Sequence, residues 1–216
     1  MPNPDHIRFQ FSPEYKHLSH ETLNNLPKVV LTHEYRGEDN AVFIENLPTD
    51  HGCALETPDK ISQWRRKYVA TTVTIDSQDA LERAIQGGAT RVRGAEALLD
   101  NFTVKGEDIV PGSAAQWVRD RSIPVEIEDM EQLSLLYEMG FTCIIDPGED
   151  TVTHKMSELV EQGFRVEELL DLTLNAIDAA FIPQDKRAHI IYDHILPTYD
   201  GMADPEADEG ATSTST

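Results

Sequence analysis

Apolar residues recur at helical spacing along the last part of the chain. From residue 166 onward they stand at positions i, i+3, i+4, i+7, i+8, i+11 and i+15, which lie on one face of a helix. The residues of this stripe are Val166, Leu169, Leu170, Thr173, Leu174, Ile177 and Phe181. Pro183 should end this helix, and a second helix is expected over 184–196, stopped by Pro197. The pattern predicts a helical layer near the carboxyl end whose apolar faces belong to the core.

Earlier in the chain, short runs rich in β-branched residues alternate with helical stretches. Strands are expected over 28–31, 68–75, 90–92, 124–127 and 142–145. Helices are expected over 12–25, 59–67, 77–86, 112–121 and 130–138, and a loop-rich stretch over 36–58. Strands that alternate with helices favour a parallel sheet in an α/β fold.

The length and charge of the chain limit its organisation and its partners. Its 216 residues suffice for one sizeable core, so we expect a single domain over 1–199 and an acidic, disordered tail over 200–216. The net charge is −21, from 39 acidic and 18 basic residues, and such a surface repels nucleic acid and anionic membranes.

Neither a membrane anchor nor an oxidising compartment is indicated by the sequence. No apolar run is long enough to span a bilayer, and the first residues lack the pattern of a secretory signal. Cys53 and Cys143 are far apart and form neither a disulfide framework nor a zinc-finger spacing. These features predict a cytoplasmic protein.

Residues 26–37 read Leu-Pro-Lys-Val-Val-Leu-Thr-His-Glu-Tyr-Arg-Gly. This segment resembles the opening strand of the adenosine deaminase family, in which Leu-Pro-Lys and three apolar residues lead into His-x-His. Residues 87–95 are similar to the family's segment around Gly-His-Gly, 117–127 to the stretch before its Pro-Leu-Glu motif, and 172–183 to its C-terminal helix. These segments keep the family's order and cover most of the chain outside 38–53 and the tail.

The resemblance implies a zinc-dependent purine nucleoside deaminase, yet the chemical positions differ. Thr32 and Glu34 stand where the family has its first two metal-binding histidines, and 71–74 stands where it has His-Ala-Gly-Glu. Gly94 replaces the histidine that orients water in the family. Asp146, before Pro147, matches an aspartate that serves the family as metal ligand and base, so it is the one candidate metal ligand.

His33 does not replace the missing ligands, because neighbouring side chains on a strand face opposite sides. Catalytic zinc usually needs three protein ligands, whereas Asp146 and Glu34 would supply only oxygen atoms, which favour magnesium or calcium. We therefore expect no catalytic residues and no retained zinc. The alternative role for Asp146 is that of a turn carboxylate before Pro147.

The chain is also short for the barrel that the resemblance implies. A (β/α)₈ barrel typically takes about 250 residues, and the resemblance resumes near residue 68 at the family's fifth strand. The central barrel units would be missing, which predicts a partial (incomplete) (β/α)₈-type barrel of about five parallel strands with a helical C-terminal layer. Its open edges would need a cover: the 38–58 stretch, a second copy or another protein.

Three functional hypotheses follow. The first is a catalytically inactive homologue, a pseudoenzyme that acts through protein association or vestigial purine nucleoside binding; its partner would be a second copy or a full-length deaminase. The second is a divergent metal-dependent deaminase whose site is rebuilt from Glu34, Asp146 and either His33 or His154. The third is that the chain is the product of a decaying gene and has no selected role.

Overall fold

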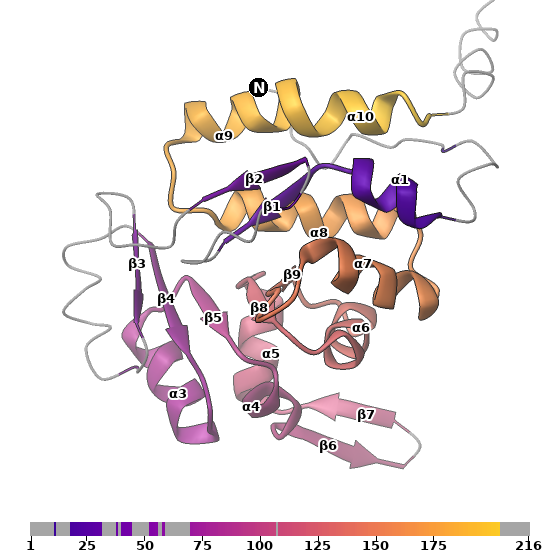
Figure 1. Ribbon diagram of the computed structural model, residues 1–216. Helices are drawn as coiled ribbons and strands as arrows, with labels where there is room; N and C mark the ends of the chain where they lie inside the picture. The colour runs from indigo at the N-terminus through magenta and orange to yellow at the C-terminus, as the bar shows by residue number, and fades with distance from the viewer. Residues whose placement is uncertain are drawn as a thin grey trace, which may run out of the picture.

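The computed structural model describes residues 11, 18–31, 38, 40–44, 52–55, 58, 70–106 and 108–203. In this part the chain is a mixed α/β protein in which helices pack around parallel strands (Figure 1). The larger sheet contains five parallel strands, in the order β3 (Gly52–Leu55), β4 (Ala70–Thr74), β5 (Arg91–Arg93), β8 (Val125–Ile127) and β9 (Cys143–Ile145). A separate parallel pair is formed by β1 (Lys28–Val30) and β2 (Ala41–Phe43), and an antiparallel hairpin by β6 (Phe102–Lys105) and β7 (Asp108–Pro111).

All five expected strands are present, but they do not share one sheet. β1 pairs with β2, and β3 takes the remaining place in the five-stranded sheet. Both β2 and β3 lie within 36–58, where the sequence predicts loops, so that prediction is wrong for these residues. The stretch is read as loop because it contains Gly37, Pro48, Gly52 and Pro58, which are typical of turns, and these residues mask the two short strands.

Most of the expected helices are confirmed. The helices are α1 (His20–Asn25), α3 (Gln78–Gly87), α4 (Glu96–Leu99), α5 (Ser113–Asp120), α6 (Met130–Glu138), α7 (Val152–Glu161), α8 (Val166–Ala179), α9 (Gln184–Ile190) and α10 (Leu196–Asp200). Side chains of Ser77, Asp129 and Thr151 cap α3, α6 and α7 by accepting hydrogen bonds from first-turn N–H groups. The first helix begins at His20, after its N-cap Ser19, so the expected start is wrong for 18–19, and α4 and α7 are not among the expected helices. The helix expected over 59–67 and residues 12–17 lie outside the described residues.

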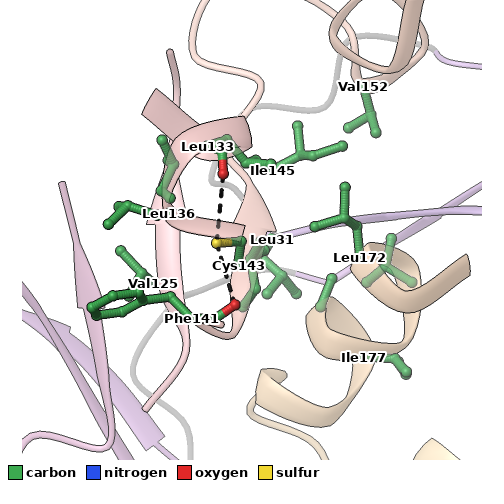
Figure 2. Close-up of a cluster of buried hydrophobic side chains, with 14 of the residues drawn as sticks. Leu31, Val125, Leu133, Leu136, Phe141, Cys143, Ile145, Val152, Leu172 and Ile177 are labelled. Atoms are coloured by element: carbon green, nitrogen blue, oxygen red, sulfur yellow. Dashed lines mark hydrogen bonds between the residues drawn. The ribbon is translucent and has the colours of Figure 1, made fainter. Parts of the chain in front are cut away.

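The apolar stripe of the C-terminal region is part of the core, as its spacing predicts. Val166, Leu169 and Ile177 of α8 are buried, and this helix packs against β9. Figure 2 shows Cys143 of β9 with α6 on one side and apolar side chains of α8 on the other. Burial raises the pKa of the Cys143 thiol to about 12. β9 is thus enclosed between two helical layers, which fixes the position of the residues that follow it.

The helix that begins at residue 184 does not end before Pro197. It continues through a π-helical segment, η4 (Ile191–Ile195), into α10, where Pro197 occupies the first turn. Within η4 the Leu196 N–H donates to the Ile191 carbonyl, five residues earlier. A proline inside a helix lacks an N–H and clashes with the carbonyl four residues before it, and the wider π-helical turn changes this geometry. The prediction that Pro197 stops the helix is therefore wrong.

The hairpin β6–β7 projects from the body below α4 and α5 (Figure 1). Its base is held by Phe102, which contacts Phe141 edge to face with 6.0 Å between ring centroids. The disordered tail is expected over 200–216, but Asp200 ends α10 and Met202 is buried, so the expectation is wrong for 200–203. From residue 204 onward the tail lies outside the described residues. Among the described helices none has the length and apolar character needed to cross a membrane.

Candidate functional site at the carboxyl ends of the strands

One face of the five-stranded sheet carries charged side chains. In a parallel sheet, residues in register point to the same face. The register pairs Thr72 with Arg91, Thr74 with Arg93, and Arg93 with Glu126. Two arginines of β5 and a glutamate of β8 therefore meet on one face, with Arg93 closer than Arg91 to the carboxyl ends of the strands.

Arg91 and Glu126 form a fully buried ion pair. Their side chains are 1% and 2% exposed, and Arg91 Nε lies 2.5 Å from Glu126 Oε1. Arg91 also donates from Nε to the Thr72 hydroxyl (2.5 Å) and from Nη1 to the Ala179 carbonyl (2.7 Å). Its guanidinium stacks over the Phe181 ring, 4.3 Å from the centroid. Burial lowers the pKa of Arg91, and the Glu126 carboxylate opposes this shift. Arg91 thus ties the sheet to the end of α8.

Arg93 lies between two carboxylates at the mouth of the strands. Its Nε is 3.1 Å from Glu126 Oε2 and 3.5 Å from Asp146 Oδ2. The Arg93 and Asp146 side chains are 27% and 20% exposed, so they mark the solvent end of the cluster. Two guanidinium groups and two carboxylates sum to a neutral cluster, formed by Arg91, Arg93, Glu126 and Asp146.

Asp146 has a second contact, within its own turn. Its Oδ1 accepts a hydrogen bond from the Gly148 N–H (3.1 Å), and its backbone N–H donates to the Ile127 carbonyl (2.9 Å). This is the Asx-type contact expected of a turn carboxylate before a proline. One carboxylate oxygen is therefore used by the turn and the other faces Arg93.

The chain is similar to a known protein over part of its length. No protein-family model matches the chain. Adenosine deaminase 1 of Streptomyces coelicolor is 27% identical in an alignment of 132 positions that covers 52% of this chain and 33% of that protein. The matched region thus spans about a third of the relative's length. Over that region the chain is similar to an adenosine deaminase.

Solved structures agree on the fold. An amidohydrolase of Burkholderia ambifaria, solved with bound Zn, gives a TM-score of 0.51 at 16% identity, over 81% of this chain and 51% of that one. The structure of the ADAL–IMP complex gives a TM-score of 0.50 at 10% identity, over 74% of this chain and 60% of that one. At these identities the likeness shows a shared α/β fold with parallel strands.

The position that matches the family's water-orienting histidine has no room for a side chain. Gly94 has a φ of +106°, and a Cβ there would lie 2.9 Å from the Ile75 carbonyl oxygen. Its N–H donates to the Glu126 backbone carbonyl (3.0 Å), which holds this backbone close to β8. A histidine at residue 94 would therefore require the backbone to move.

The described residues do not supply a zinc site of the family's kind. Among them, no group of three or more His, Cys, Asp or Glu side chains is arranged to hold a metal. Thr32, His33 and Glu34 lie outside the described residues. His154 lies in the first turn of α7, where it contacts Asp150 and Glu158 at 3.4 Å each. Asp146 thus shares Arg93 with the Glu126 carboxylate, and these two carboxylates fall short of a group of three ligands.

Sequence reasoning identifies Asp146 but misses Arg91, Arg93 and Glu126. The available signal is the alternation Arg91-Val92-Arg93, which puts two charged residues on one face of a short strand. Whether Glu126 lies on the same face depends on how β5 and β8 pair, and the sequence alone does not specify that register.

Proposed function

We propose that this chain is an adenosine-deaminase-like protein without deaminase activity, a pseudoenzyme that acts by binding. The observation that supports the proposal is the contact of Arg93 with both Glu126 and Asp146 at the mouth of the strands. A positively charged side chain occupies the neighbourhood in which the family, by the resemblance, holds its metal.

The chemistry of purine deamination explains why this contact matters. The reaction needs a metal that lowers the pKa of bound water to about 7 and a group that protonates the ring. Two like unit charges 4 Å apart near a protein surface repel by about 4 kcal/mol, and a divalent metal doubles this. A metal at Asp146 would therefore compete with Arg93 and be repelled by it.

The finer fold that we propose is an incomplete (β/α)₈-type barrel. In support of it, the parallel strands lie side by side in the order in which they occur along the chain, two in one sheet and five in the other. Within the described residues β2 is not paired with β3, nor β9 with β1. Unpaired edges of this kind favour association with a second copy or with a deaminase-type partner.

Vestigial nucleoside binding would use the same end of the strands. A recess of about 450 Å³ lies there, next to the ends of β5 and β8. It is lined by Gly94, Ala95, Glu96, Ile127, Glu128, Asp129, Gln132 and Lys155. Three carboxylates in this lining would accept hydrogen bonds from amino and hydroxyl groups of a nucleoside.

A binding experiment separates the Arg93 contact from general loss of structure. Zinc titration by calorimetry should show no stoichiometric site in the wild-type protein. Arg93→Met should acquire weak divalent-metal binding, because two carboxylates lose their counter-charge, whereas Arg119→Met on α5 should not. Tight stoichiometric zinc in the wild-type protein would contradict the proposal.

Association is tested separately, by size-exclusion chromatography with light scattering. The expected result is a dimer, or a stable complex with a co-expressed full-length deaminase. A folded monomer that ignores the deaminase would contradict the association role and leave only nucleoside binding.

A further inference from the structure

A groove lies between the β1–β2 pair and the C-terminal helices, away from the strand ends that carry the charged cluster. Figure 1 shows α9 and α10 running alongside β1, β2 and α1. The groove has a volume of about 600 Å³. It is lined by Asn25, Pro27, Asn40, Ala41, Val42, Lys186, His189, Ile190, His194 and Thr198. Four of these residues are apolar, and they give the groove a surface on which an apolar body can lie.

The π-helical segment places two histidines of this groove side by side. In a regular α-helix residues five apart are rotated by roughly 140° and face different directions. The η4 segment closes a hydrogen bond across five residues, from Leu196 N–H to the Ile191 carbonyl. His189 and His194 are five residues apart, and their rings meet edge to face with 5.4 Å between centroids. Such π-helical turns occur frequently at functional sites.

The charges of this groove differ from those of the rest of the chain. Its ionisable lining residues are Lys186, His189 and His194, and none of the lining residues is acidic, although acidic residues outnumber basic ones 39 to 18 in the sequence. His189 Nδ1 contacts the Asp193 carboxylate, which orients the ring, and its Nε2 has no partner among the described residues. Neither does the His194 ring make a hydrogen bond there. The ionisable groups that line the groove are therefore nitrogen bases, and the carboxylate in contact with them is that of Asp193. Asn25, Asn40 and Thr198 add side chains that both donate and accept hydrogen bonds.

We propose that this groove binds a small organic anion. A phosphate or carboxylate head would accept hydrogen bonds from Lys186 and His194, and from Nε2 of His189 when both nitrogens of that ring carry protons. The apolar body would lie over Pro27, Val42 and their neighbours. The site uses none of the residues of the charged cluster, so it is independent of the proposed loss of deaminase chemistry.

Phenyl phosphate is the probe, because it joins an oxyanion to an apolar ring. We expect saturable binding by calorimetry, with shifts of the His189 and His194 imidazole signals in NMR spectra. Lys186→Ala, His189→Gln and His194→Gln should each weaken binding by about tenfold, the change expected from one lost charge-assisted hydrogen bond. Inorganic phosphate should bind more weakly than phenyl phosphate.

The matched control is His154→Gln on α7. His154 is exposed to a similar degree as His189, 56% against 63%, and it too contacts a carboxylate four residues away. This variant should bind phenyl phosphate as the wild-type protein does. Absence of saturable binding, equal weakening in His154→Gln, or inorganic phosphate binding as tightly as phenyl phosphate would each overturn the proposal. Because the substituted side chains are exposed, circular dichroism should show all variants folded.

Discussion

Replacing Arg91 with methionine tests how much of the fold depends on the buried ion pair. Methionine keeps the length of the side chain but removes its charge and its donors. The substitution takes away the contact with Glu126 and the hydrogen bonds to Thr72 and to the Ala179 carbonyl. It also removes the cation stacked on Phe181, although the thioether retains part of that packing.

The expected loss follows from the burial of both partners. With the Arg91 and Glu126 side chains 1% and 2% exposed, solvent does not screen the carboxylate that remains. Removing one partner of such a pair costs about 3–5 kcal/mol. That is a large share of the total stability of about 5–15 kcal/mol that a folded domain has.

Urea unfolding, followed by circular dichroism, gives the free energy of unfolding of each variant. The double variant Arg91→Met, Glu126→Leu should recover most of the loss, because it also removes the buried Glu126 carboxylate, which in the single variant keeps only Arg93 as a charged partner. A loss below about 1 kcal/mol in Arg91→Met, or a double variant as unstable as the sum of both single variants, would show that the pair is not buried as described.

Three further outcomes are expected. In urea unfolding, Gly94→Ala should lower the free energy of unfolding by about 1–3 kcal/mol more than Gly163→Ala does. Both glycines have a φ near +100° (+106° and +101°), but only at Gly94 would the added Cβ lie 2.9 Å from a carbonyl oxygen. Equal losses in the two variants would exclude the steric explanation. Cys143, with its pKa raised to about 12 from 9.0, should resist alkylation in the native protein at pH 9. Its contribution to the free energy of unfolding should fall by about 1.4 kcal/mol per pH unit from pH 9 to 12, since only the unfolded thiol ionises there. Peptide mapping that finds rapid labelling of the native protein would contradict this. Glu38→Ala should lower the free energy of unfolding by about 1–2 kcal/mol, because the Glu38 carboxylate accepts three hydrogen bonds from the start of α7. The control Glu131→Ala, at an exposed residue, should lower it little, and the two urea unfolding curves can be compared directly.

The long, strongly periodic elements of the fold are predictable from the sequence. α8 is identified by its apolar stripe, because fourteen residues give the helical period room to appear. β2 and β3 are missed, since they lie in a stretch whose glycines and prolines indicate loops, and their place is decided by pairing with β1 and β4. Pro197 misleads for another reason: the rule that proline stops a helix assumes a regular α-helix, and η4 is not one.

The candidate site is only partly predictable. Asp146 is found because the segment before Pro147 resembles that of the adenosine deaminases. Its partner Arg93 is not found, because the contact joins side chains on different strands and depends on the register of β5 with β8 and β9. The same holds for His189 and His194, which meet only because the helix between them widens.

The most direct test of the proposed loss of deaminase activity is an adenosine turnover assay. It is run with added zinc at high protein concentration and followed by ultraviolet absorbance. We expect no conversion to inosine above the zinc-only background, for a sample shown to be folded by circular dichroism. Turnover that disappears in Asp146→Ala would contradict it and would mean that a metal site forms at Asp146 despite Arg93.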